Sequence, residues 1–352
     1  MKRTNLTPNE HKVLYGLTKY PHISDSELST IIQVKMSTLT SIKRRLKERK
    51  LFKTLTIPLI NRLGCELLSV IYMQYNPVIP LEERVQTTKK TIEVFDEIFF
   101  SAGEQEKGFS ISLAKNYTDV ERINEIRTET FGQMGLLEDE YPHEVIFPFE
   151  TSHIDRFFDY SRLLHQTFSL KEIDAPQSNM KWFTPIDCVD LSIKERRVYI
   201  ALVEHPDATA QQIADVVGLS RHTVARMKER FFTDGLLRQI VLPHLAELGF
   251  ELLVFSHITF NLHRFPSTEE TAFLDTPSTV FFSRRKFEAV LISAYQTYQE
   301  YKEDEMKKIR YLKEKNLIVS PPVIQPYSFN RMVNIKDFTF APIAKKVVAT
   351  LQ

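Results

Sequence analysis

The chain has 352 residues, 43% of them hydrophobic and 26% charged, which is ordinary for a soluble globular protein and allows roughly two to four modest domains. Its formal net charge of +1 excludes a globally basic protein, so nucleic-acid binding would need local basic faces. The two cysteines, Cys65 and Cys188, exclude a disulfide framework and a four-cysteine zinc site. No apolar run reaches the roughly 18 residues of a membrane span, and the N-terminus lacks the apolar core of a signal peptide, so we expect a cytoplasmic protein.

Two segments of the chain carry the same residue pattern at one constant offset of 185 positions (191 − 6) without a gap. The first segment covers 6–76 and the second 191–261. The residues that recur are Leu6, Glu10, Leu17, Pro21, Thr38, Leu51, Pro58, Leu63, Gly64, Glu66, Leu67, Leu68 and Asn76. A shared fold and a shared origin explain this better than chance does, so we predict a duplicated unit.

The second segment has the pattern of a winged helix. Ser192 and Glu195 have the spacing of a capping box, which begins a first helix. A second helix follows, and Gly218 supplies a tight turn before a third helix over 221–232. A strand over 236–241 comes next, as the wing of a winged helix would.

The outer face of each third helix carries short polar and cationic side chains, which suit the major groove of DNA. Residues near the N-terminal end of such a helix reach bases, and later cations reach phosphates. We expect base contacts from Ser37, Thr38, Ser41, Lys43, Arg221, His222, Thr223 and Arg226. We expect phosphate contacts from Arg44, Lys47, Lys53, Lys228, Arg230 and Arg238. The alternative is a solvated face, or a winged helix that binds proteins.

The segment after each winged helix has a β-α-β-β-α-β pattern, which predicts a ferredoxin-like sandwich. In the first half the expected strands are 67–75, 97–102, 109–114 and 145–149, with helices over 81–94 and 119–134. In the second half they are 252–260, 279–283, 289–295 and 319–332, with helices over 267–274 and 298–316. Short helices are expected over 156–168 and 343–351.

We therefore predict an α+β chain of two tandem units. Its segments are a winged helix (1–62), a ferredoxin-like domain (63–168), a linker (169–189), a second winged helix (190–247) and a second ferredoxin-like domain (248–352). In the helix over 298–316 we expect the apolar positions to be Tyr301, Met306, Ile309 and Leu312. The charge run Glu303-Asp304-Glu305 is interpreted as a solvated face.

The second winged helix resembles that of the leucine-responsive (Lrp/AsnC) regulator family. The residues that carry the resemblance are Leu191-Ser192, Glu195, Ile213-Ala214, Gly218 to Val224 and Gly235 to Leu237. The resemblance implies a transcription regulator that binds DNA as a dimer or higher oligomer and often senses an amino acid or a similar small molecule. It also implies an effector site, for which the nearest match is Gly103, Glu104 and Asp119. The tandem arrangement departs from the family, whose usual members carry one copy.

These observations together predict a sequence-specific double-stranded-DNA-binding transcription regulator that reads the major groove with two unlike recognition helices. The chain would act as a homodimer or as an intrachain pseudo-dimer on an asymmetric site. We find no metal-ligand spacing, no catalytic motif and no cofactor motif, and therefore expect no enzyme activity, no metal and no cofactor. The alternative is a protein-interaction scaffold without sequence-specific DNA binding.

Overall fold

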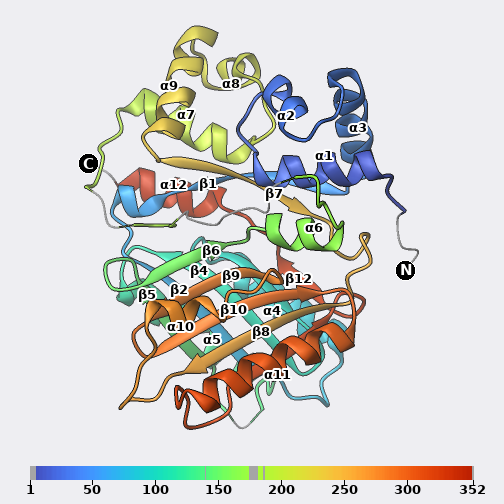
Figure 1. The fold of residues 1–352 in the computed structure, drawn as a ribbon. Helices are drawn as coiled ribbons and strands as arrows, with labels where there is room; N and C mark the ends of the chain where they lie inside the picture. Colours follow the sequence, from blue (N-terminus) through green and yellow to red (C-terminus); the bar gives the residue numbers. More distant parts are fainter. Residues whose placement is uncertain (1–4, 139, 174–180, 185–186, 351–352) are drawn as a thin grey trace. The chain divides into compact units, whose positions relative to one another are not determined.

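The computed structural model describes residues 5–138, 140–173, 181–184 and 187–350. Parts of the predicted linker (169–189) therefore lie outside the described residues. The described chain mixes helices with sheets, which confirms the predicted fold class at that level, and its element order is consistent with two tandem units (Figure 1). None of the described helices is long and apolar enough to cross a membrane.

Each half begins with three helices and a strand. In the first half these are α1 (Pro8–Lys19), α2 (Asp25–Ile31), α3 (Met36–Glu48) and β1 (Phe52–Pro58). In the second they are α7 (Ile193–Glu204), α8 (Ala210–Val217), α9 (Arg221–Thr233) and β7 (Leu237–Pro243). The strands β1 and β7 pair in a two-stranded sheet.

Local sequence explains the beginnings and turns of these helices. The backbone N–H of Ser192 donates to the Glu195 carboxylate over 2.8 Å, so the predicted capping box is present. Gly218 has a left-handed backbone (φ 65°) at the end of α8, where glycine avoids a steric cost. The corresponding residue of the first half, Gln33, adopts the same conformation (φ 55°) without being glycine. Both halves thus make the same turn with different residues.

The remaining elements follow β-α-β-β-α-β order in each half. The first half has η1 (Ile60–Leu63), β2 (Leu67–Gln74), α4 (Leu81–Glu93), β3 (Ile98–Gly103), β4 (Lys107–Ala114), α5 (Tyr117–Gln133), β5 (His143–Pro148), β6 (His153–Phe157) and α6 (Ser161–Thr167). The second has β8 (Leu252–Thr259), α10 (Thr268–Ala272), β9 (Thr279–Arg285), β10 (Glu288–Tyr295), α11 (Tyr298–Glu314), β11 (Val323–Ser328), β12 (Val333–Lys336) and α12 (Ala341–Thr350). The segment expected as one helix over 156–168 begins with the end of β6, because Arg156 and Phe157 pair with β9, and it then contains α6.

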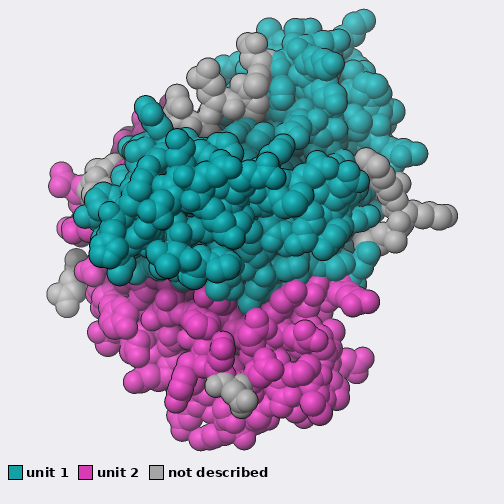
Figure 2. All heavy atoms as spheres, turned by 60° about the horizontal axis from the view of Figure 1, so that its bottom comes forward, with its two compact units in different colours: residues 1–54, 152–182, 239–330 teal, residues 55–151, 183–238, 331–352 magenta. Residues whose placement is uncertain are grey.

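The chain divides into two compact units, and each combines segments of both halves (Figure 2). Unit 1 comprises residues 1–54, 152–182 and 239–330, and its five-stranded sheet has the order β11-β8-β10-β9-β6. Unit 2 comprises residues 55–151, 183–238 and 331–352, and its sheet has the order β12-β3-β4-β2-β5. Each sheet therefore takes its last strand, β6 or β12, from the end of the other half of the chain.

A buried ion pair holds β6 in unit 1. The guanidinium of Arg156, which is 0% exposed, donates from Nε and Nη2 to the Asp275 carboxylate over 2.9 and 2.8 Å. Arg162 of α6 donates to the same carboxylate over 2.9 Å. Burial alone would lower the pKa of Arg156, but the hydrogen bonds and charge of Asp275 outweigh burial and raise that pKa. Arg156 therefore stays charged inside the core.

Aromatic side chains and a buried lysine attach the end of the chain to the sheet of unit 2. Phe340 stacks on Phe99 of β3 with ring centroids 4.6 Å apart. The ammonium of Lys336 in β12 donates to the backbone oxygen of Phe95 over 2.6 Å. Phe99 and Phe100 of β3 are buried, as are the phenylalanines at the matching positions of β9, Phe281 and Phe282.

Candidate functional site

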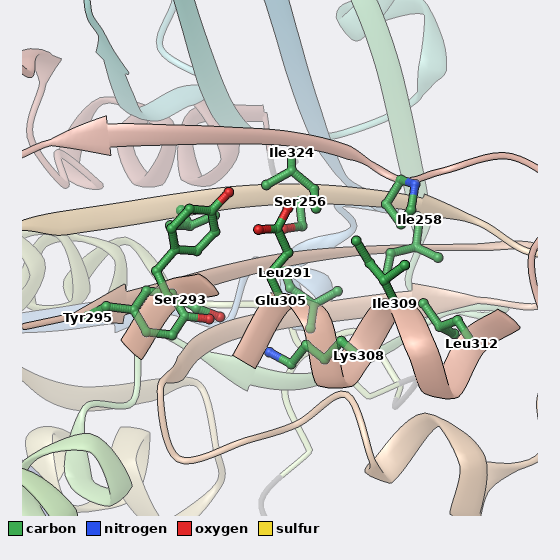
Figure 3. A pocket seen from close by; sticks show the side chains of 13 residues that line it. Ser256, Ile258, Leu291, Ser293, Tyr295, Glu305, Lys308, Ile309, Leu312 and Ile324 are labelled. Atoms are coloured by element: carbon green, nitrogen blue, oxygen red, sulfur yellow. The ribbon is translucent and has the colours of Figure 1, made fainter. Parts of the chain in front are cut away.

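A pocket lies in unit 1 between the sheet and α11 (Figure 3). It has about 430 Å³ of space that protein atoms do not fill, part of it open to solvent. We call it the α11 pocket. Its apolar wall is formed by Val254, Ile258, Leu291, Ile309, Leu312, Pro322 and Ile324, and its polar side chains are Ser256, Ser293, Tyr295, Tyr301, Glu305 and Lys308.

The helical period of α11 places chemically active residues on the sheet side. Tyr301, Glu305, Lys308 and Leu312 follow one another at spacings of four, three and four residues, which is one face of a helix. Met306, which we expected to be apolar and inward, is 56% exposed. The interpretation of residues 303–305 as a solvated face is wrong for Asp304 and Glu305, whose side chains are only 16% and 15% exposed.

A hydrogen-bonded network of four charged or polar groups lies beside the pocket. The hydroxyl of Tyr295 donates to Asp304 Oδ2 over 2.6 Å, and Lys308 Nζ lies 2.8 Å from the same oxygen. Asp304 itself is held by Thr276, whose hydroxyl donates to that oxygen over 3.4 Å. One carboxylate therefore fixes both the phenol and the ammonium that line the pocket.

Charge also surrounds the second tyrosine of the pocket. The ammonium of Lys302 donates to Glu305 Oε2 over 2.6 Å and lies 4.8 Å from the ring centroid of Tyr301. The Tyr301 ring is 5.7 Å from that of Tyr295. The pocket thus has two tyrosines side by side, with an ammonium group next to each.

Both tyrosines keep their protons at neutral pH. Burial, with a further contribution from the charge of Asp304, raises the pKa of Tyr295 well above its usual value. Burial and the charge of Glu305 raise the pKa of Tyr301 in the same way. A phenol that remains protonated beside an apolar wall can donate a hydrogen bond or a proton to a bound ligand.

The residues predicted to contact DNA in the second half lie on or after α9. Arg221, His222 and Arg226 are exposed, whereas Thr223 is half-buried and its backbone N–H donates to the capping Ser220. Of the expected phosphate contacts, Lys228 and Arg238 are half-buried, and Arg230 pairs with Glu195 of α7 at 2.5 Å. Contact of these side chains with DNA stays a prediction.

The corresponding residues of the first half lie on α3 and β1. Exposed side chains are Ser37, Ser41, Arg44 and Lys47, while Thr38, Lys43 and Lys53 are half-buried. Lys43 forms an ion pair of 2.6 Å with Asp25, and Arg44 lies 3.8 Å from Glu48. The structure therefore keeps a basic α3, part of whose charge is offset locally.

The structure does not bring the expected effector residues together. Gly103 and Glu104 lie where β3 turns into β4, but Asp119 lies in the first turn of α5, after the far end of β4. The eight residues of β4 separate the two places by about 25 Å at the usual rise of a strand. The three residues cannot line one small-molecule site.

The sequence matches no protein-family model and no curated protein. Among solved structures, two of the siroheme decarboxylase NirDL resemble nearly the whole chain. The first has a TM-score of 0.51 and 11% identity and covers 97% of this chain and 99% of that one. The second, a co-complex with an iron-uroporphyrin III analogue, has a TM-score of 0.50 and 11% identity and covers 98% and 100%. At this identity the likeness shows a common fold.

Regulators of the AsnC family also occur among the structural neighbours, each over part of the chain. One from Pyrococcus furiosus is 22% identical, covers 41% of this chain and 89% of its own, and has a TM-score of 0.31. AsnC from E. coli is 14% identical, covers 41% and 93%, and has a TM-score of 0.31. These scores are too low to carry a conclusion about this chain.

The full-length matches correct two predictions. The sequence led us to expect a DNA-binding transcription regulator without enzyme activity, and the structures that match almost the whole chain are those of an enzyme. The prediction failed because the residues that carry the resemblance are caps, turn glycines and core positions. Such residues specify a fold, and one fold hosts unrelated functions.

Proposed function

We propose that this chain is an enzyme that decarboxylates an iron tetrapyrrole bearing carboxylate side chains. The observation that carries the proposal is the likeness of both halves together, over 97% of the chain, to a siroheme decarboxylase. We further infer that the two halves are copies of one unit and form a pseudo-dimer within one chain, which the constant offset and the exchanged strands β6 and β12 support.

We place the reaction in the α11 pocket. A tetrapyrrole is a flat apolar ring with charged side chains, and the lining of the pocket combines an apolar wall with one cation, Lys308, and one carboxylate, Glu305. Ile258, Ile309 and Leu312 would contact the ring edge, and Lys308 would attract a carboxylate. Asp304 holds the Lys308 ammonium at 2.8 Å, so a bound carboxylate would share this cation with Asp304.

Decarboxylation requires a proton donor. When a side-chain carboxylate leaves as carbon dioxide, the carbon–carbon bond breaks and its electron pair stays on the side-chain carbon, which then takes a proton. We assign the donor to Tyr295: its hydroxyl proton, which is donated to Asp304 in the free protein, would pass to the side-chain carbon, and a proton from solvent would then restore the phenol. The bound iron macrocycle is the substrate, and it supplies the conjugated system that accepts electron density during bond cleavage.

Two measurements test this function on the full chain. Binding is followed by absorbance during titration with iron-uroporphyrin III, and turnover by mass spectrometry of siroheme incubated anaerobically with the protein. We expect saturable binding and a product that has lost carbon dioxide. A chain that neither binds the macrocycle nor changes the mass of siroheme would contradict the proposal.

A pair of tyrosine variants locates the reaction. Tyr295→Phe removes the hydroxyl that donates to Asp304 and should lower turnover by about 100-fold or more, the usual contribution of a positioned acid, while binding changes little. Tyr298→Phe is the matched control, because Tyr298 is the first residue of α11, does not line the pocket and is 59% exposed. Equal turnover by both variants would show that the α11 pocket is not the reaction site.

A further inference from the structure

Unit 2 contains a buried arginine whose charge has no contacting counterion. Arg127 of α5 is 0% exposed, and its guanidinium donates to Ser110 Oγ and to Asn124 Oδ1, both over 2.9 Å. Both acceptors are neutral. Burial lowers the pKa of Arg127 to about 10, and the charges of Tyr75 and Glu144 oppose this only in part. A buried cation of this kind is unfavourable unless an anion joins it, because burial removes its hydration.

Several polar atoms around Arg127 are buried without a hydrogen-bond partner. They are Arg127 Nε, Ser69 Oγ and Glu144 Oε1. Arg127 Nε and Ser69 Oγ can donate a hydrogen bond, and Ser69 and Glu144 lie on the side of the sheet that faces α5, the helix of Arg127. Buried polar atoms are nearly always hydrogen-bonded, so a cluster of such atoms is a candidate site for a polar ligand.

The strand register places these groups on one patch. Ile71 of β2 lies between Ser110 of β4 and Glu144 of β5, and directly opposed residues share a face of the sheet. Ser69 is two residues before Ile71 on β2 and therefore points to the same side. Arg127 covers this row from the helix, since it reaches Ser110.

The corresponding space of unit 1 is the α11 pocket. Arg127 is ten residues after Tyr117, the first residue of α5, and Lys308 is ten residues after Tyr298, the first residue of α11. Ser112 in β4 and Ser293 in β10 correspond in the same way. The fold thus leaves room between helix and sheet at this position in one unit, and in both units a cation faces that position.

We propose that unit 2 binds the carboxylate of a small organic acid at Arg127, between α5 and strands β2, β4 and β5. Arg127 Nε and the hydroxyl of Ser69 donate to the bound carboxylate. Only a small acid fits, because Arg127, Ser69 and Ser110 are almost completely buried. Asn124 and Glu144, which are partly exposed, lie on the solvent side, so rotation of their side chains opens the way in.

Glu144 sets the strength of binding. Its carboxylate approaches the same patch as the incoming anion and repels it, although no ion pair joins it to Arg127. Burial and the charge of Glu121 raise the pKa of Glu144, and the charge of Arg127 with a hydrogen bond from Asn124 opposes them in part, so Glu144 lies within electrostatic reach of Arg127. Removal of the Glu144 charge should therefore strengthen anion binding, whereas removal of the Arg127 charge should abolish it.

The test is a titration of the full chain with ¹³C-labelled acetate, in which NMR relaxation of the carboxylate signal measures binding. A parallel titration with chloride at equal ionic strength is the reference. We expect saturable binding by the unchanged chain and at least about tenfold weaker binding by Arg127→Met, since a charged hydrogen bond is lost. Arg122→Met is the matched control on an exposed face of α5 and should bind as the unchanged chain does.

Glu144→Gln keeps the proposal testable if the arginine variant does not fold, because Glu144 is partly exposed and its amide replacement has the same shape. It should bind acetate several-fold more tightly. No saturable binding by the unchanged chain, equal binding by Arg127→Met, or unchanged or weaker binding by Glu144→Gln would each overturn the proposal. The site does not depend on the proposed decarboxylation, and acetate binding tests it separately.

Discussion

Replacement of Asp275 by asparagine should destabilise unit 1 by about 3 kcal/mol. The change keeps the shape of the side chain but removes the charge that accepts two hydrogen bonds from Arg156 and one from Arg162. Loss of one partner of a buried ion pair costs about 3–5 kcal/mol, since the other charge stays buried. We take the lower end, because the Asp275 side chain is 19% exposed and Asp159 remains 3.3 Å from Arg156.

The protein has a local reporter for this measurement. Trp182, the single tryptophan of the chain, is 6% exposed and its ring lies 5.1 Å from that of Phe157 in β6. Its backbone N–H also donates to the oxygen of Ile154, in the same strand, over 3.1 Å. Urea denaturation followed by tryptophan fluorescence therefore reports the unfolding of the part of unit 1 that the ion pair holds.

An exposed ion pair of the same unit is the control. Arg44 and Glu48 lie 3.8 Å apart with side chains 77% and 67% exposed, so water screens their attraction and Glu48→Gln should change stability by less than about 0.5 kcal/mol. If Asp275→Asn shifts the fluorescence transition no more than Glu48→Gln does, then the ion pair does not hold β6 in unit 1. Our account of the exchanged strand would then be wrong.

Three further predictions follow from single sites. Residues 33 and 218 both have a left-handed backbone, which favours glycine. In thermal melts, Gln33→Gly should therefore stabilise the chain by up to about 1 kcal/mol, and Gly218→Ala should destabilise it by about 1 kcal/mol. Stability changes of the opposite signs would contradict the prediction. One thiol should react quickly with a thiol reagent, since Cys188 is exposed while burial, and less strongly Asp119, raises the pKa of Cys65 to about 12; two fast thiols would refute it. Burial alone would raise the pKa of Glu10, but hydrogen bonds from Thr7 and Arg45 outweigh burial and lower that pKa below 4.5. The ionised Glu10 therefore stabilises the fold above pH 4.5, and this stabilisation is lost as the pH falls through the folded pKa. Glu10→Gln should reduce the dependence of the unfolding free energy on pH in this range, and an unchanged dependence would count against the prediction.

The sequence predicted the elements whose signals are local. Capping residues, the turn at Gly218 and the alternation of the strands lie within a few residues of what they specify, so the helices and the β-α-β-β-α-β order could be recognised. The strands β6 and β12 could not be recognised in this way. Their partners, β9 and β3, lie more than a hundred residues away along the chain, and short strands without such partners carry little signal.

The polar side of the α11 pocket was missed for another reason. Three adjacent acidic residues look like a solvated face when they are read as a run. Read at helical spacing, Tyr301, Glu305 and Lys308 lie on one face with Leu312, which is buried. The signal was present in the sequence, but it required asking which charged residues share the apolar face. Function was harder to predict than structure, because the repeated pattern of capping and turn residues includes no catalytic group.

Under the proposed duplication, Lys308 of α11 and Arg127 of α5 occupy the same helix position with different surroundings. In unit 1 the counterion of Lys308 is Asp304, one turn earlier on the same helix, so the opposite wall can stay apolar and open. In unit 2 the residue equivalent to Asp304 is Ile123, which packs in the core, and the only nearby carboxylate of the described patch is Glu144 on the edge strand. A counterion on the helix leaves the facing wall of the pocket apolar. In unit 2 the helix has no carboxylate at this position, so the arginine is left to be neutralised by something small. The same cation position therefore favours a substrate pocket in one unit and a small-acid site in the other.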